Sequence, residues 1–306
     1  MTISFQDQVA IVTGSGRGLG REYALDIARR GGAVVIADIG LDADSGRARA
    51  DLVVEEIEKL GGRAVAATEN VATSAGGAAI VERALHSFGR VDVLIHNAGF
   101  LRPGFFDELS DDAVGEVLDV HLSGAFHVGR PAWKQMKTQS YGRVVLTSSG
   151  SIFGYHASAN YAAAKSAMIG LATALANEGA EHGIGVNAIL PLAQSDIGRD
   201  NPVPGSSMQM LREQLDTHRA RWQPDSVSAL VIYLASADCR ASGHFYSAVA
   251  GRYARVALAV SQGWLAMPEI PSAEAIGEHF DQIDSLSQTD HPASMIEEMK
   301  QALDRL

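Results

Sequence analysis

The chain has 306 residues, of which 46% are hydrophobic and 20% charged, as is usual for a protein with one large or two small domains. Its net charge of −11 argues against nucleic acid as a partner, because phosphate binding needs clustered Lys and Arg. The single cysteine, Cys239, excludes an internal disulfide, and no apolar run is long enough to cross a membrane. With no signal-like order at the N-terminus, the sequence predicts a cytoplasmic protein.

A glycine-rich stretch near the N-terminus lies between a strand pattern and a helix pattern. Residues 9–12 are apolar, residues 21–30 have helical spacing, and between them stands Thr13-Gly14-Ser15-Gly16-Arg17-Gly18-Leu19-Gly20. Glycines let the backbone approach a pyrophosphate without a Cβ in the way, and the N–H groups of a helix start attract phosphates. The stretch therefore predicts a dinucleotide site, although a tight turn without a ligand would need the same glycines.

The second predicted strand carries the clue to the cofactor. Residues 33–37 are a continuous apolar run, typical of a strand buried on both faces of a parallel sheet, and Asp38 follows them. An acid here can accept both ribose hydroxyls of NAD and would repel the additional phosphate of NADP. Arg17 argues the other way, because it could meet that phosphate. On balance the sequence predicts NAD.

Strands and helices continue to alternate after a polar loop at residues 40–49. Helices are predicted near residues 52–60 and 74–88, and strands at 63–68 and 91–95. This alternation predicts an α/β fold of one domain, a Rossmann-like doubly wound parallel sheet. Ligands bind such sheets at the carboxyl ends of the strands, where we expect Asn70, Val71, Asn97, Ala98 and Gly99.

The chemistry is expected from the next strand and helix. A strand at residues 143–147 ends in Ser148-Ser149, and the helix that opens near Ser158 carries Tyr161 and Lys165 on one face, four residues apart. A lysine ammonium and a cationic nicotinamide would lower the pKa of the Tyr161 phenol from about 10. Tyr161 would then act as general acid or base, Ser149 would stabilise the reacting oxygen, and Lys165 would bind the ribose.

The C-terminal part is less regular. A sixth strand at residues 186–190 is closed by Pro191, and residues 192–224 read as a mobile segment over the carboxyl edge that closes on substrate. A helix over 225–236 and a last strand over 245–249 complete a catalytic domain of residues 1–250. We expect residues 251–306 to form a helical extension that packs on the same domain.

Several of these motifs together resemble the short-chain dehydrogenase/reductase family over about residues 5–250. They are the glycine motif, Asn97-Ala98-Gly99, a serine, and Tyr161-Ala162-Ala163-Ala164-Lys165. The resemblance implies an NAD-dependent oxidoreductase with Ser149, Tyr161 and Lys165 as catalytic residues. The residues that it implies for dinucleotide binding are Gly14, Arg17, Gly18, Leu19, Gly20, Asp38, Asn70, Val71, Asn97, Ala98, Gly99, Tyr161, Lys165 and Pro191.

Further stretches are similar to one branch of the family, the (3R)-hydroxyacyl-CoA dehydrogenase unit of peroxisomal multifunctional enzyme type 2. They include the loop at 40–49, His121 to Phe126, Ala132-Trp133 and the extension. The resemblance implies a (3R)-3-hydroxyacyl-CoA as substrate and a homodimer or homotetramer, with no membrane or nucleic acid as partner. A hydroxysteroid dehydrogenase, an NADPH-dependent 3-ketoacyl reductase and a catalytically silent dinucleotide sensor stay open as alternatives.

Three departures from the family pattern and one ambiguity bear on the site. His121 stands where many members have an Asn whose backbone carbonyl holds a relay water, and we count it among the catalytic residues. Asn70 replaces the usual Asp, and Leu192 replaces a glycine beside the nicotinamide amide. The serine position is ambiguous, and we choose Ser149 over Ser148 because strand ends are more rigid anchors than loops. No metal site is expected, because the chain has no Cys pair and no His spacing typical of ligands.

Overall fold

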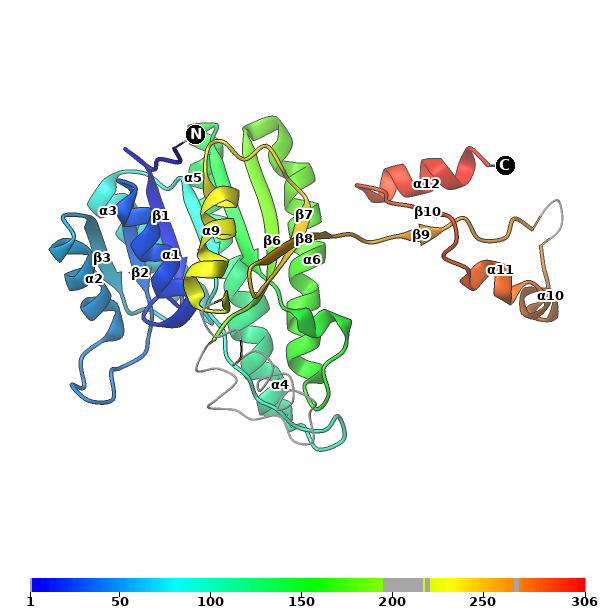
Figure 1. Cartoon of the computed structure of the whole chain (residues 1–306), viewed down its shortest axis with the longest axis horizontal. Helices are drawn as coiled ribbons and strands as arrows, with labels where there is room; N and C mark the ends of the chain where they lie inside the picture. The colour runs from blue at the N-terminus through cyan, green and yellow to red at the C-terminus, as the bar shows by residue number, and fades with distance from the viewer. Residues whose placement is uncertain (1, 195–216, 218–220, 267–269, 306) are drawn as a thin grey trace. The chain divides into compact units, whose positions relative to one another are not determined.

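The computed structural model describes residues 2–194, 217, 221–266 and 270–305. Within these residues an eight-stranded sheet has the strand order β3-β2-β1-β4-β5-β6-β7-β8 (Figure 1). The strands are β1 (Val9–Thr13), β2 (Ala33–Ala37), β3 (Arg63–Ala67), β4 (Val93–His96), β5 (Gly142–Thr147), β6 (Ile184–Leu192), β7 (His244–Val249) and β8 (Arg252–Val256). All pairings from β3 to β7 are parallel, which confirms the predicted α/β fold.

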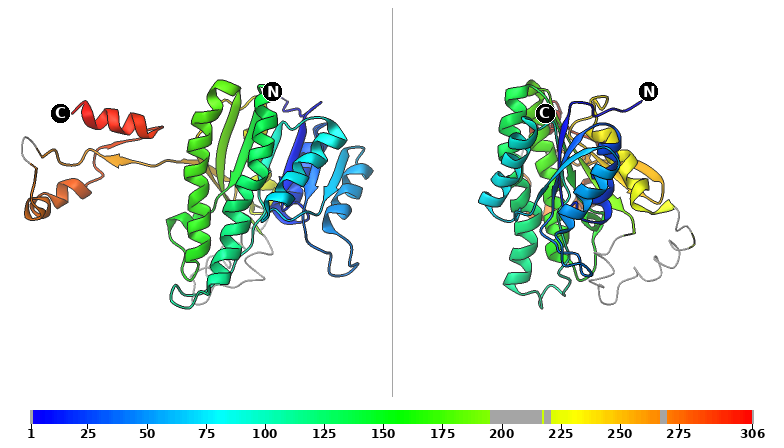
Figure 2. Two further views of the ribbon diagram at one scale, coloured as in Figure 1. Left: turned by 180° about the vertical axis from the view of Figure 1, so that it is seen from behind. Right: turned by 90° about the vertical axis from the view of Figure 1, so that its left-hand side faces the viewer.

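Helices cover both faces of the sheet, as the right-hand view of Figure 2 shows. One layer contains α1 (Gly18–Arg29), α2 (Arg49–Lys59) and α9 (Pro224–Ala235), and the other contains α3 (Ser74–Phe88), α4 (Asp111–Leu118), α5 (Gly124–Gln139) and α6 (Ala159–Gly179). Every residue of β1 and β2 is buried, so these apolar strands need a layer on each side. This double covering is what sets the carboxyl ends of β1, β2, β4 and β5 along one open edge.

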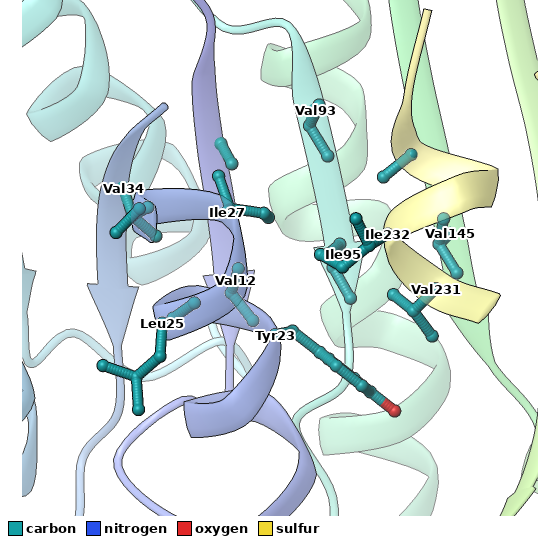
Figure 3. Close-up of a cluster of buried hydrophobic side chains, with 14 of the residues drawn as sticks. Val12, Tyr23, Leu25, Ile27, Val34, Val93, Ile95, Val145, Val231 and Ile232 are labelled. Carbon is teal, nitrogen blue, oxygen red and sulfur yellow. The ribbon is translucent and has the colours of Figure 1, made fainter. Parts of the chain in front are cut away.

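The core between α1, α9 and the sheet fixes the glycine turn in place. Figure 3 shows Tyr23 and Ile27 of α1 facing Val231 and Ile232 of α9, with Ile95 of β4 beneath them. Burying an apolar side chain of this size contributes about 2 kcal/mol, so the cluster anchors α1 firmly. The first turn of α1 is therefore a rigid platform at the end of β1.

The helical stretch formed by α4 and α5 is interrupted. Between α4 and α5 the chain forms a π-helical turn, η1 (Asp119–Ser123), in which the Gly124 N–H bonds to the carbonyl of Asp119, five residues back. Such wide turns are rare and occur often at functional sites. Two 3₁₀ turns, η2 (Gly150–Phe153) and η3 (Ala180–His182), flank α6.

The first unit extends beyond the predicted boundary at residue 250. Ala250 and Gly251 both have positive φ, 49° and 82°, which is the backbone of a tight hairpin turn, and β8 follows it beside β7. The chain divides into two compact units, residues 1–255 and 256–306. The predicted domain therefore gains this strand, which its polar, alternating residues did not reveal.

The second unit has short elements of its own. They are β9 (Val260–Ser261), β10 (Thr289–Asp290), α10 (Ala273–Glu278), α11 (Phe280–Asp284) and α12 (Met295–Leu303). The Ser294 hydroxyl accepts the N–H of Glu297 and so caps the start of α12. Whether this unit packs on the first stays a prediction. Most of the segment 192–224 lies outside the described residues, and no described helix is long and apolar enough to span a membrane.

Candidate active site

The glycine turn has the conformation that its sequence predicts. Gly14 and Gly18 have φ values of 65° and 56°, which favour glycine. A Cβ on Gly14 would lie 2.7 Å from the Cα of Ala98, and one on Gly20 would overlap the carbonyl oxygen of Gly14. No described side chain caps the start of α1 at Gly18, so the backbone N–H groups there can serve a ligand. These are the features of a phosphate cradle.

A cleft of about 290 Å³ opens at the carboxyl ends of β1, β2 and β4. Ten of the residues predicted to bind a dinucleotide line it: Gly14, Arg17, Gly18, Leu19, Asp38, Asn70, Val71, Asn97, Ala98 and Gly99. The other four do not line it: Gly20 packs behind the turn, Pro191 pairs with Ala248 inside the sheet, and Tyr161 and Lys165 lie at the end of β5. The cleft also contains residues that the sequence did not indicate, namely Ala37, Ile39, Gly40, Arg49, Glu69, Phe100 and Val120.

Asp38 binds two backbone groups at the rim of the cleft. Its Oδ2 accepts the N–H of Gly16 at 2.8 Å, and its Oδ1 accepts that of Gly40 at 2.7 Å. Each carboxylate oxygen retains acceptor capacity for a ribose hydroxyl. Arg49 reaches the cleft because its own N–H donates to the carbonyl of Gly40, which folds the loop at 40–49 back on itself. Only this long-range turn could have revealed Arg49.

Asn97 and Asn70 shape the cleft rather than simply facing it. The Asn97 side-chain amide donates to the carbonyls of Thr13 and Gly14, both at 3.1 Å. The Thr13 hydroxyl accepts the N–H groups of Asn97 and Ala98 at 3.0 Å. These bonds tie the end of β1 to the end of β4. The Asn70 side-chain oxygen accepts the N–H of Ala72, which holds the turn after β3.

Tyr161 and Lys165 lie next to each other at the end of β5. The Lys165 Nζ is 5.7 Å from the centroid of the Tyr161 ring and donates to the carbonyl of Thr147 at 2.7 Å. Burial lowers the pKa of Lys165 to about 7. The pKa of the Tyr161 phenol is raised by burial, against a lowering by its hydrogen bond with Ser149. In the chain by itself, desolvation outweighs this hydrogen bond, and the lowering expected from Lys165 together with a cationic nicotinamide stays a prediction for the complex.

The two neighbouring serines have different surroundings. Ser148 is 1% exposed, and its hydroxyl donates to the carbonyl of Lys165 at 2.8 Å, which joins β5 to α6. Ser149 accepts the N–H of Ser151 at 3.1 Å and interacts with the Tyr161 phenol. The Ser148 hydroxyl is used in a structural hydrogen bond, whereas Ser149 contacts the Tyr161 phenol, so Ser149 stays the predicted catalytic serine.

His121 is brought against Tyr161 by the π-helical turn. The two rings meet edge to face, with centroids 5.3 Å apart. Its Nε2 lies 2.9 Å from the carbonyl and 3.1 Å from the amide nitrogen of Phe100, while its Nδ1 is buried without a hydrogen-bond partner among the described residues. Burial, with a smaller contribution from Lys165, keeps the pKa of His121 well below its usual value.

His96, to which the sequence reading gave no role, lies behind this turn. Its Nε2 is 3.0 Å from the carbonyl oxygen of His121, and its Nδ1 is 3.3 Å from the Thr13 hydroxyl. The one signal for it was its position between a buried strand and Asn97. Among the described residues no cluster of His, Cys, Asp and Glu could hold a metal ion.

Comparison with known proteins places this site in a family. The family model for short chain dehydrogenases matches residues 8–195. A short-chain type dehydrogenase/reductase of Mycobacterium tuberculosis is 40% identical over 92% of this chain and 96% of its own length. The peroxisomal hydratase-dehydrogenase-epimerase of Saccharomyces cerevisiae is 39% identical over 87% of this chain, which spans only 29% of that protein.

A solved structure extends the likeness to the fold. Full-length peroxisomal multifunctional enzyme type 2 from Drosophila melanogaster matches with a TM-score of 0.80 and 31% sequence identity. The match covers 99% of this chain and 50% of the fly chain. The chain thus corresponds to one part of these longer peroxisomal proteins and to nearly all of the mycobacterial relative.

Proposed function

Because the chain belongs to the short-chain dehydrogenase family, we propose that it is an NAD-dependent dehydrogenase that interconverts a (3R)-3-hydroxyacyl-CoA and its 3-keto form. The observation that carries the proposal is the placement of two groups along one sheet edge. Asp38 and the glycine turn stand at the ends of β2 and β1, and Ser149 and Tyr161 stand at and beyond the end of β5.

The cleft fits a dinucleotide. The Gly14 and Gly18 turn with the start of α1 would hold the pyrophosphate, Asp38 the adenosine ribose, and Asn70 with Val71 the adenine. NAD is favoured over NADP because a carboxylate at the ribose repels a phosphate. Arg17 and Arg49 also line the cleft, so this preference needs a direct test. When bound, the nicotinamide supplies hydride transfer.

Side chains of this protein carry out the proton transfers. In the oxidation direction the Tyr161 phenolate takes the proton of the substrate hydroxyl while the carbon gives up its hydride; in reduction Tyr161 returns the proton. Ser149 donates to the reacting oxygen and stabilises its developing charge. Lys165 lies one helical turn from Tyr161, and a positive charge there favours the phenolate. His121 closes the far side of the Tyr161 ring.

Apolar residues around the site favour a substrate with a long hydrocarbon part. Phe105 and Phe106 follow β4, and Phe153 follows β5; they are 39%, 84% and 72% exposed. Their loops are joined, since the Gly104 N–H donates to the carbonyl of Ala157 at 2.9 Å and the Phe105 ring contacts His156. Exposed aromatic side chains on loops beside a site are what an acyl chain would cover. We extend the proposal to a homodimer or homotetramer in the cytoplasm.

The test is turnover of the pure protein with a series of (3R)-3-hydroxyacyl-CoA chain lengths, followed by absorbance of the reduced nicotinamide. A hydroxysteroid and NADP are the comparison reagents. Turnover of acyl-CoA with NAD supports the proposal, and turnover of the steroid alone keeps the mechanism but moves the substrate class. NADP preference contradicts the role given to Asp38. Binding of NAD without any turnover contradicts the proposed reaction.

A further inference from the structure

A chain of three buried polar groups runs behind the active site and has no part in the chemistry described so far. It begins at the Thr13 hydroxyl of β1, passes through the ring of His96 at the end of β4, and ends at the backbone carbonyl of His121 in the π-helical turn. His96 is 2% exposed and His121 1%. Polar groups this deeply buried must be hydrogen-bonded, or they cost stability.

Counting hydrogen-bond donors and acceptors assigns the proton in each of the bonds that join these three groups. The Thr13 oxygen accepts two backbone N–H groups, from Asn97 and Ala98, so its own proton is left for the Nδ1 of His96. That nitrogen must then be the acceptor, and the proton of a neutral imidazole stands on Nε2. The Nε2 faces the His121 carbonyl, which can only accept. One tautomer therefore satisfies all partners.

The charge state of His96 agrees with this assignment. Burial lowers its pKa to about 4, with a further lowering by the charge of Lys165. The ring is therefore neutral at neutral pH, and a second proton on Nδ1 would oppose the Thr13 hydroxyl. Lys165 of α6 acts on both histidines, Tyr161 of α6 contacts the His121 ring, and His96 also acts on His121.

The position of the His121 ring depends on this turn. A Cβ on Gly99 would overlap the His121 ring, and a Cβ on Gly124 would lie 3.4 Å from the His96 ring, so both rings fill their space closely. A π-helical turn widens the backbone and leaves its carbonyls less constrained than those of an α-helix. The bond from His96 supplies the missing constraint on the carbonyl of the residue that packs on Tyr161.

We propose that His96 is a positioning residue, which holds the His121 turn by its carbonyl and so keeps the His121 ring packed against Tyr161. The inference rests on the proposed dehydrogenase function for its catalytic readout. His96 thereby links the predicted cofactor cleft, where Thr13 binds the N–H groups of Asn97 and Ala98, to the turn that carries His121. Because His96 is not among the residues that line the cleft, its removal should alter kcat more than the binding of NAD.

The experiment separates the two bonds of the His96 ring. An asparagine oxygen reaches roughly as far as Nδ1, so His96→Asn keeps the bond from Thr13 and loses the one to His121. A glutamine amide reaches roughly as far as Nε2, so His96→Gln keeps the bond to the His121 carbonyl and loses the other. The matched controls are His244→Asn and His244→Gln, since His244 lies at the start of β7, on the opposite edge, and contacts the Tyr246 hydroxyl.

We expect His96→Asn to lower kcat about 10- to 100-fold with the KM for NAD within about twofold, and His96→Gln to retain most of kcat. The melting temperatures of both His96 variants should decrease by similar amounts. The two His244 variants should leave kcat unchanged. Equal kcat in the two His96 variants, or losses of kcat that simply follow melting temperature, overturn the proposal.

The tautomer gives a second test that needs neither a variant nor a substrate. Nitrogen NMR of isotope-labelled histidine distinguishes a proton on Nε2 from one on Nδ1. We expect a neutral His96 with its proton on Nε2, in the free protein and with NAD added. A proton on Nδ1, or a charged ring at neutral pH, overturns the inference. Absence of wild-type turnover would instead contradict the proposed function, and the NMR result would still decide the place of His96.

Discussion

The cofactor cleft and the catalytic cluster lie along the same edge of the sheet but are built differently. The cleft is made by backbone: glycine turns, N–H groups and carbonyls held by Asp38 and Asn97. The cluster is made by titratable side chains, the buried Lys165 and His121 and the partly buried Tyr161, whose pKa values are displaced by desolvation. Substitutions in the cleft should therefore act through shape, and those in the cluster through protons.

The largest effect is expected when the proton carrier of the cluster is removed. Tyr161→Phe keeps the ring and its packing on His121 but deletes the hydroxyl, so kcat should fall about 10²- to 10⁴-fold. Binding of NAD, measured by calorimetry, should be nearly unchanged. If NAD binding were lost together with turnover, the cleft and the cluster would not be separable in the way described.

The second effect is the pH dependence of stability that the buried ring of His96 produces. Its pKa is about 4 in the folded protein against an ordinary 6.5, so the unfolded chain binds a proton that the folded chain refuses between these values. The contribution of His96 to the free energy of unfolding is therefore fully present above pH 6.5. It is lost as the pH is lowered towards 4, and the loss amounts to about 3 kcal/mol. Denaturant unfolding at several pH values should show the loss in the wild type.

The matched protein for this pH series is His96→Gln, which cannot titrate there. Its stability should fall less steeply over the same pH interval, because the His96 contribution is gone. Parallel curves for the two proteins would mean that other groups dominate acid unfolding and that His96 is not held neutral.

Substitutions of Ser148 and Ser149 test which of the two serines belongs to the catalytic cluster. Ser149→Ala should lower kcat about 100-fold, since the hydroxyl that stabilises the reacting oxygen is lost. Ser148→Ala should instead reduce the free energy of unfolding by about 1 kcal/mol, through the lost bond to the Lys165 carbonyl, with kcat within about tenfold of wild type. Kinetics and denaturation of both variants check this, and the reverse pattern would make Ser148 the catalytic serine.

The smallest effect tests the cleft by shape alone. Gly14→Ala and Gly61→Ala both place a side chain at positive φ, 65° and 78°, and this backbone strain should cost about 1 kcal/mol of stability at either position. Only at Gly14 does the new Cβ meet the backbone of Ala98; at Gly61 nothing lies within reach. NAD binding should weaken roughly tenfold in Gly14→Ala only. Equal NAD affinity in the two variants would contradict the cradle.

Local sequence patterns predicted which residues form the cleft better than they predicted the properties of the catalytic cluster. Glycine spacing and apolar runs determine a strand, a turn and a helix within about thirty residues, so ten of the residues predicted to bind a dinucleotide line one cleft, and their binding role stays a prediction. The pKa of Tyr161 in the chain by itself is raised by burial in the whole fold, and no local pattern in the sequence shows that burial. His96 and Arg49 were missed for the same reason. Their partners come from a different strand end or a folded-back loop, which no local pattern specifies.

The hairpin formed by β7 and β8 has a consequence for handling the molecule. β8 covers the outer side of β7 and presents the exposed Arg252 and Arg255. A chain cut after Val249 would leave a row of unpaired backbone groups on β7, open to strand addition by another molecule and so to aggregation. A shortened protein that stays dispersed should therefore keep these two arginines and the strand that carries them.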